Sequence, residues 1–129
     1  MKSEFKNHNF LSSFKNAISG IRHTYKNERN ILIQSIFAVI AITCGIFFKI
    51  SLVEWMILAI VIFIVLICEL FNTAIEDLSD AVDENYNEKI KMVKDVAAGA
   101  VTLSSLLSVI VGIMMFLPKL ITFFNIYGG

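Results

Sequence analysis

Three long apolar segments dominate the hydrophobic pattern of the chain. The first is interrupted only by Gln34, Ser35 and Thr43, and the second remains apolar as far as Ile67. An α-helix needs about 20 mostly apolar residues to cross the hydrocarbon core of a bilayer. The pattern therefore predicts an all-α membrane protein with three membrane-spanning helices, at about residues 31–49, 52–82 and 91–118.

The second predicted helix changes character at Glu69. Before this position it is apolar on all sides, whereas Glu69, Asn72, Glu76 and Asp80 recur at spacings of three and four. At about 100° per residue, these side chains share an arc of roughly 80°. A carboxylate at the hydrocarbon boundary is costly, so Glu69 and Glu76 are predicted to be functional. The alternative is that the helix only leaves the membrane here, which is the interpretation we prefer for the remaining acidic residues, Asp77, Asp83, Glu84 and Glu88.

Residues 5–26 show an amphipathic helical pattern, with an apolar stripe at Phe10, Phe14, Ala17, Ile18, Ile21 and Tyr25. Aromatic side chains beside lysine and arginine are typical of a helix in the plane of the membrane interface. A surface helix packed on the rest of the protein is the alternative. We therefore divide the chain into an interfacial segment, residues 1–30, and a membrane domain, residues 31–129. His8 and His23 are predicted to face solvent or lipid headgroups.

Composition and charge agree with a membrane protein. The chain is 57% hydrophobic with a mean hydropathy of +0.73, whereas soluble domains are about 45–50% apolar. The formal net charge is zero, which gives no basic field for nucleic acid. In the three-span model, Lys49 and Lys119 lie on one side of the membrane, and all the other lysines and arginines lie on the side of the N-terminus. The N-terminus is therefore predicted to be cytoplasmic, in the cell membrane. Cys44 and Cys68 are predicted to be free thiols.

Small residues are concentrated in the third predicted helix, at Ala97, Ala98, Gly99, Ala100, Ser104, Ser105, Ser108 and Gly112. Small residues let helices approach closely in lipid. This helix is therefore predicted to lie at the centre of a bundle or at a subunit contact. Pro118, the only proline, lies near its end, and a short apolar tail is predicted to follow.

In this topology the ionisable residues gather at one membrane face. Glu28 precedes the first span, Glu69 and Glu76 end the second, and Lys94 and Asp95 precede the third. Mg²⁺ takes oxygen ligands, usually one or two carboxylates with substrate phosphates and water, and a lysine stabilises phosphate charge. The sequence contains no Walker A pattern or Gly-rich loop, so a nucleotide site here would lack the usual phosphate cradle.

These residues also carry a resemblance to a known family. The segment Glu69-Leu70-Phe71-Asn72-Thr73-Ala74-Ile75-Glu76, with Lys94-Asp95 before Ala97-Ala98-Gly99-Ala100-Val101, resembles the signature of the prokaryotic diacylglycerol kinase and undecaprenol kinase family. The resemblance covers roughly residues 10–117. It implies a homotrimer with three transmembrane helices and an interfacial helix per chain, which transfers the γ-phosphoryl group of ATP to a membrane lipid hydroxyl.

The resemblance also implies roles for individual residues. Glu69 matches the general base, and Asn72 would orient the base or the phosphate. Glu28 and Glu76 match the Mg²⁺ ligands. The nucleotide-contacting positions are these two glutamates with Lys94, Asp95, Asn85, Tyr86 and Asn87. Phosphoryl transfer needs mainly positioning and charge neutralisation, so a sparse site is sufficient.

Two departures from the family pattern concern the lipid side. Relatives often carry an arginine before the Ser-Phe-Lys stretch, where this chain has Asn7-His8-Asn9, which leaves Lys6 or Lys15 as weaker substitutes. Where relatives have an acidic residue or a histidine, this chain has Gln34. We predict that Lys15, Gln34 and Glu69 contact the lipid. Undecaprenol is the predicted acceptor and diacylglycerol the alternative, and a non-enzymatic scaffold or cation-binding subunit is the rival from another class.

Overall fold

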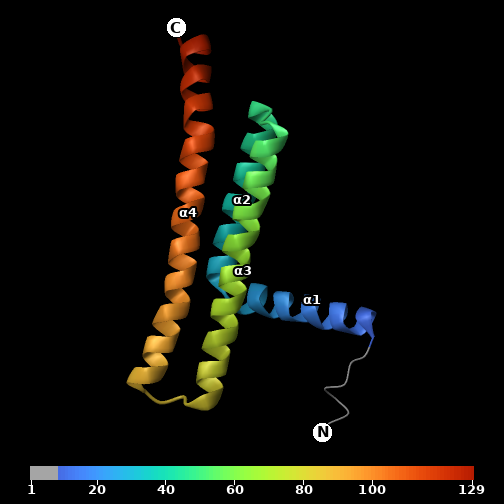
Figure 1. Ribbon diagram of the computed structural model, residues 1–129, viewed down its shortest axis with the longest axis vertical. Helices are drawn as coiled ribbons and strands as arrows, with labels where there is room; N and C mark the ends of the chain where they lie inside the picture. Colours follow the sequence, from blue (N-terminus) through green and yellow to red (C-terminus); the bar gives the residue numbers. More distant parts are fainter. Residues whose placement is uncertain (1–8) are drawn as a thin grey trace.

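A computed structural model describes residues 9–129 as four α-helices joined by short links. They are α1 (Phe10–Asn27), α2 (Arg29–Phe48), α3 (Leu52–Val82) and α4 (Glu88–Tyr127). The three long helices run alongside one another, and α1 projects sideways from them (Figure 1). Each of the three is long and apolar enough to cross a membrane. The predicted all-helical architecture with three such helices is confirmed, and the part of the predicted amphipathic helix at residues 5–8 lies outside the described residues.

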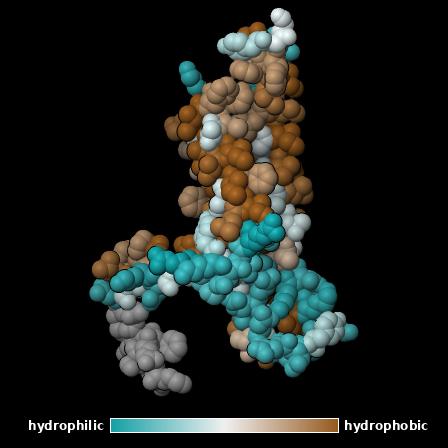
Figure 2. Space-filling view, turned by 180° about the vertical axis from the view of Figure 1, so that it is seen from behind, coloured by the Kyte–Doolittle hydropathy of each residue, from teal (hydrophilic) through white to brown (hydrophobic). Residues whose placement is uncertain are grey.

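Most large apolar side chains of the long helices face outward. Phe37, Phe63 and Leu103, one from each helix, are all more than 60% exposed. Hydrophobic side chains cover most of the long helices on the face shown in Figure 2, whereas hydrophilic ones gather over α1 and the nearby end of the molecule. Soluble monomers rarely expose apolar patches larger than a few hundred Å². The surface is therefore that of a membrane protein.

The helix at the centre of the chain is α3. It contacts each of the other three helices, whereas α4 packs mainly against α3. A small cluster of buried apolar side chains lies at this packing. It consists of Leu58 of α3, Met115 of α4 and Ile50 from the α2–α3 connection. The prediction that the small-residue helix lies at the centre of a bundle or at a subunit contact stays a prediction.

A tight connection joins α2 to α3. Lys49 ends α2 in the left-handed conformation, with a φ of 52°, and the amide of Ile50 donates to the carbonyl oxygen of Gly45 at 3.1 Å. Ser51 and Glu54 then form a capping box, in which each side chain accepts a hydrogen bond from the other residue's amide. The local sequence therefore fixes where one long helix ends and the next begins.

Helix α4 continues through Pro118 to Tyr127, so it extends beyond the predicted end at residue 118 and the short apolar tail after Pro118 is helical. Proline removes a helical hydrogen bond, but membrane helices tolerate it where other groups satisfy the backbone. Next to the proline, Lys119 donates from Nζ to the carbonyl oxygen of Met115 at 3.2 Å and also forms an ion pair with Glu54 of α3. The last turns of α4 extend past the α2–α3 connection (Figure 1).

Gly45 marks a close approach of α2 to the start of α3. A Cβ atom at this position would lie 2.8 Å from the Trp55 ring and 3.0 Å from Ile50. Overpacking costs about 1–3 kcal/mol, against a gain in helix propensity of about 1 kcal/mol for Gly→Ala. We expect Gly45→Ala to lower the thermal unfolding midpoint in detergent micelles. Gly20→Ala is the control, because a Cβ there meets no atom within 4 Å, and equal shifts in the two variants would contradict the close approach.

Candidate functional site

Glu69 is the one ionisable side chain in residues 9–129 that is fully buried, with 0% of its surface exposed. It lies on α3, just after the apolar half of the helix. Gln34 of α2 donates a hydrogen bond from Nε2 to Oε2 of Glu69 at 3.1 Å. The other carboxylate oxygen, Oε1, is buried without any hydrogen-bond partner. One oxygen of the carboxylate is therefore held by Gln34, and the other is available to a hydrogen-bond donor or a cation.

Three buried oxygen atoms at this place lack a donor. They are Oε1 of Gln34, Oε1 of Glu69 and Oδ1 of Asn72. Leaving a buried polar atom unpaired costs about 1–3 kcal/mol, and native structures keep few such atoms. All three are acceptors, so their complement is a hydroxyl group, another hydrogen-bond donor or a cation. An anion alone would not satisfy them.

Glu28 approaches the same region from the link between α1 and α2. Burial is the largest cause that raises the pKa of Glu28 above its ordinary value of 4.5, and repulsion from the carboxylates of Glu76 and Asp77 raises it further. His23 lowers this pKa. Glu69 lies within electrostatic range of both Glu28 and Glu76. Three carboxylates from the α1–α2 link and α3 therefore share one electrostatic environment.

Asn72 connects the buried and the solvent-facing parts of this cluster. Its Nδ2 donates to Oε1 of Glu76, one turn further along α3, at 3.3 Å. Within the described part of the chain, no group of three or more His, Cys, Asp or Glu side chains is arranged to hold a metal ion. The pair Glu28 and Glu76 could thus supply only part of a coordination shell. The polar face of α3 meets Gln34 and lies within electrostatic range of Glu28. The roles of these residues stay predictions.

Two contacts fix α1, and with it Glu28, against the other helices. The Tyr25 hydroxyl and the Ser35 hydroxyl lie 2.6 Å apart, and His23 Nε2 lies 2.9 Å from Asp77 Oδ2. Thr24, between these two residues, is buried. The prediction that His23 faces solvent or headgroups agrees with the structure, because its side chain is 55% exposed. Asp77 is solvated as predicted, with 58% of its side chain exposed, and in addition it pairs with His23. The sequence carried no signal for this pair, which spans 54 residues.

The predicted nucleotide-contacting residues lie around the start of α4. Lys94 donates to Oδ1 of Asp80 at 2.5 Å and lies within electrostatic range of Glu76. Asp95 instead accepts from Lys91 at 2.6 Å and is exposed. Lys94 therefore borders the carboxylate cluster, whereas Asp95 is engaged within its own helix.

The link between α3 and α4 holds the other predicted nucleotide contacts. The Asn85 amide donates to Asp83 at 2.9 Å, and Asn87 caps α4 by accepting from the amides of the first helical turn. Tyr86 is 78% exposed. Asn87 thus has a structural role as an N-cap, and Tyr86 offers a free ring. Lys15, the predicted lipid contact on α1, is exposed. Cys44 and Cys68 are free cysteines.

The raised pKa of Glu28 predicts a pH-dependent stability. Because the charged form is disfavoured in the folded protein, the penalty grows as the pH rises from the ordinary pKa of 4.5 through the raised pKa, and it vanishes below 4.5. Without divalent cations, Glu28→Gln should therefore raise the unfolding midpoint in micelles at pH 7. The difference from the unsubstituted protein should shrink as the pH falls toward 4.5. A pH-independent difference would show that the carboxylates do not repel one another.

Comparison with known proteins agrees with the geometry. Residues 15–116 match the family model described as prokaryotic diacylglycerol kinase. The chain is 39% identical over 111 residues to an undecaprenol kinase of Bacillus subtilis, covering 86% of this chain and 90% of that protein. It is also 36% identical over 115 residues to a diacylglycerol kinase of Synechocystis, covering 88% of this chain and 66% of that protein. These matches confirm the resemblance and set aside the alternative of a non-enzymatic scaffold or cation-binding subunit. The chain belongs to the prokaryotic diacylglycerol kinase family of membrane lipid kinases.

Proposed function

We propose that this lipid kinase transfers the γ-phosphoryl group of ATP to the hydroxyl group of undecaprenol, with Mg²⁺ as cofactor. The observation that carries the proposal is the Glu69 carboxylate, with Oε2 held by Gln34 and Oε1 buried and unpaired. A lipid hydroxyl is the donor that this oxygen lacks. The similarity to an undecaprenol kinase supports the prenol, and the similarity to a diacylglycerol kinase keeps diacylglycerol as the alternative.

In the proposed reaction, Glu69 acts as the general base. Its Oε1 accepts the hydroxyl proton while the lipid oxygen forms a bond to the γ-phosphorus, and the bond from that phosphorus to the bridging oxygen of ATP breaks. ADP leaves with the bridging oxygen, and the product is a lipid phosphate monoester. Gln34 positions the base through Oε2, and Asn72 positions the neighbouring Glu76.

The residues fit a divalent cation. Glu28 and Glu76 supply hard oxygen ligands from two elements, and their mutual repulsion is the charge that a cation would relieve. Mg²⁺ commonly takes one or two carboxylates and completes its shell with phosphate oxygens and water. When bound, Mg²⁺ would neutralise charge on the phosphates. Lys94 would add a positive charge on the nucleotide side, next to Asp95 and the Asn85–Asn87 link.

The exposed stripe of α1 supports a position in the membrane interface. Phe10 is 85% exposed and Phe14 58% exposed, and α1 lies across the direction of the long helices at the hydrophilic end of the molecule (Figures 1 and 2). Aromatic side chains on such a helix would enter the headgroup region. We infer a cytoplasmic N-terminus in the cell membrane, and a homotrimer in which the small residues of α4 face a subunit contact.

A side-by-side acceptor assay tests the proposed function. Transfer of labelled γ-phosphate from ATP to undecaprenol and to diacylglycerol is measured in mixed micelles, with and without EDTA. We expect kcat/KM to be at least about 10-fold higher for undecaprenol, the discrimination that about 1.4 kcal/mol provides, and EDTA to abolish transfer. A preference for diacylglycerol, or transfer that survives EDTA, would contradict the proposed acceptor or the proposed cofactor, respectively.

A further inference from the structure

His23 joins the end of α1 to α3 through a directed set of hydrogen bonds. The side-chain nitrogen of Asn27 can only donate, and it lies 3.1 Å from Nδ1 of His23, so Nδ1 accepts. The ring hydrogen is therefore on Nε2, which donates to Oδ2 of Asp77 at 2.9 Å. Asn27 also donates to the carbonyl oxygen of His23 at 2.9 Å. The ring is thus held in one orientation, with its donor directed at α3.

Glu28 is the single residue between α1 and α2. Its backbone is extended, with a φ of −112° and a ψ of 121°, and its amide donates to the carbonyl oxygen of Thr24 at 2.8 Å. Helix α1 lies beside the long helices only near this end, and its other end projects away from them (Figure 1). With 18 residues, this helix is about 27 Å long. A turn of α1 about the link would therefore redirect the Glu28 carboxylate.

Two side-chain contacts in the described part of the chain oppose such a turn, and they act on different helices. The Tyr25 hydroxyl lies 2.6 Å from the hydroxyl of Ser35 on α2. Helix α2 is already joined to α1 by the one-residue link. The pair of His23 and Asp77 reaches α3 instead, the helix that carries Glu76. This pair therefore fixes α1 relative to the helix of the second proposed Mg²⁺ ligand.

The two proposed ligands are positioned in different ways. Glu76 accepts a hydrogen bond from Asn72 of its own helix at 3.3 Å. Glu28 lies within electrostatic range of Glu76 and Asp77, but its position depends on α1. We propose that His23 is a positioning residue for the cation site, which holds Glu28 near its partner carboxylate by tying α1 to α3. This inference rests on the proposed function and adds to the site a residue that binds no cation itself.

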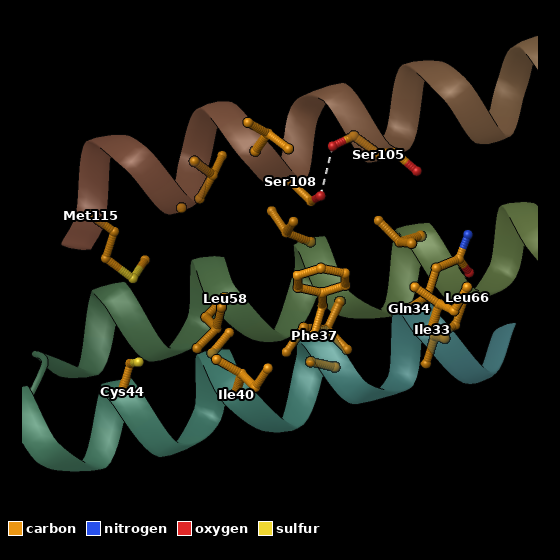
Figure 3. Close-up of a pocket in the computed structure, with 18 of the residues that line it drawn as sticks. Ile33, Gln34, Phe37, Ile40, Cys44, Leu58, Leu66, Ser105, Ser108 and Met115 are labelled. Atoms are coloured by element: carbon orange, nitrogen blue, oxygen red, sulfur yellow. Dashed lines mark hydrogen bonds between the residues drawn. The ribbon is translucent and has the colours of Figure 1, made fainter. Parts of the chain in front are cut away.

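The pair lies apart from the apolar side of the molecule. An apolar groove runs between α2, α3 and α4, with Gln34, a predicted lipid contact, at one end (Figure 3). Neither His23 nor Asp77 lines this groove, and their side chains are more than half exposed. Loss of the pair should therefore weaken cation binding and leave the KM for the lipid unchanged.

Glutamine and asparagine at position 23 separate the hydrogen bond from the charge. The side-chain nitrogen of glutamine can reach the place of Nε2, whereas that of asparagine reaches only the place of Nδ1. Both side chains are neutral, so His23→Gln and His23→Asn remove any charge on the ring equally. Asp77→Ala removes the acceptor, and both variants are also made in that background.

Two kinds of measurement compare these variants. The first is the Mg²⁺ concentration for half-maximal activity, together with kcat at saturating Mg²⁺ and the KM for undecaprenol. The second is the Kd for Mn²⁺, from the EPR signal of the free ion, in protein without lipid or nucleotide. The second measurement reports on the cation site without any turnover.

We expect His23→Asn to raise both the Mg²⁺ requirement and the Mn²⁺ Kd about threefold, a modest change because exposed charge pairs are weak. His23→Gln should match the unsubstituted protein, because it keeps the donor. In the Asp77→Ala background, the two variants should be equal.

The inference would be overturned by equal values for His23→Asn and His23→Gln when Asp77 is present, or by a difference that survives Asp77→Ala. A loss confined to kcat or to the KM for undecaprenol would overturn it as well, because α1 would then act on something other than the cation. Transfer that survives EDTA would instead refute the proposed cofactor, and the Mn²⁺ titration would still test the pair.

Discussion

Replacing Glu69 by glutamine is expected to lower kcat for lipid phosphorylation by about 10²–10⁴-fold, the range that general-base catalysis contributes. Glutamine has nearly the same shape, and its side-chain oxygen can still accept from Gln34 as Oε2 does now. It cannot take a proton from a lipid hydroxyl. The loss should therefore appear in kcat, while KM for ATP changes little. Initial rates of labelled phosphate transfer measure both.

The matched control for this variant is Glu84→Gln. Glu84 is exposed in the α3–α4 link, so the same change of charge there should leave kcat within about twofold. The Glu69→Gln protein should also unfold at a temperature no lower than the unsubstituted one, because a neutral amide is easier to bury than a carboxylate. Full activity of Glu69→Gln would mean that another group takes the proton.

Glu28→Gln and Glu76→Gln are expected to raise the Mg²⁺ concentration for half-maximal activity by about 10–100-fold, as changes around metal sites commonly do. Each substitution removes one of two carboxylates that the structure places in electrostatic contact. Substrate phosphates and water would still supply the other ligands. Activity should therefore recover substantially at high Mg²⁺, as measured by titration at fixed ATP and lipid.

The two classes of variant should separate under this titration. High Mg²⁺ should rescue Glu28→Gln and Glu76→Gln but not Glu69→Gln, because added cation cannot replace a base. The Mg²⁺ titration of Glu84→Gln should match that of the unsubstituted protein. If the activation curve of Glu76→Gln is also unchanged, Glu76 does not bind the cation, and its role is limited to the hydrogen bond with Asn72.

The features that the sequence predicted correctly depend on residues that lie close together along the chain. Three apolar segments of sufficient length define the long helices, and helical spacing puts Glu69, Asn72 and Glu76 on one face of α3. What the sequence did not reveal are the contacts between distant segments. The pairing of His23 with Asp77 depends on the angle between α1 and α3, and the ion pair of Lys119 with Glu54 depends on how α4 packs on α3. No pattern along the chain specifies these angles.

The position of Gln34 shows the same division. The sequence predicted that it lies on the lipid side of the site, from its place in the first span. Its hydrogen bond to Glu69 joins residues 35 apart and depends on the register between α2 and α3. That register is set at the far end of the hairpin, where the Lys49 turn and the Ser51–Glu54 capping box fix the connection. The geometry of the proposed site thus depends partly on residues at the opposite end of the long helices.

The most direct test of the central claim is the stereochemical course of transfer from ATP made chiral at the γ-phosphorus. If Glu69 only removes a proton, the lipid oxygen displaces ADP in a single in-line step, and the configuration at phosphorus must invert. If a carboxylate such as Glu69 acts instead as a nucleophile, the phosphoryl group passes through a covalent enzyme intermediate, and two displacements retain the configuration. The account predicts inversion in the lipid phosphate, and retention would contradict it.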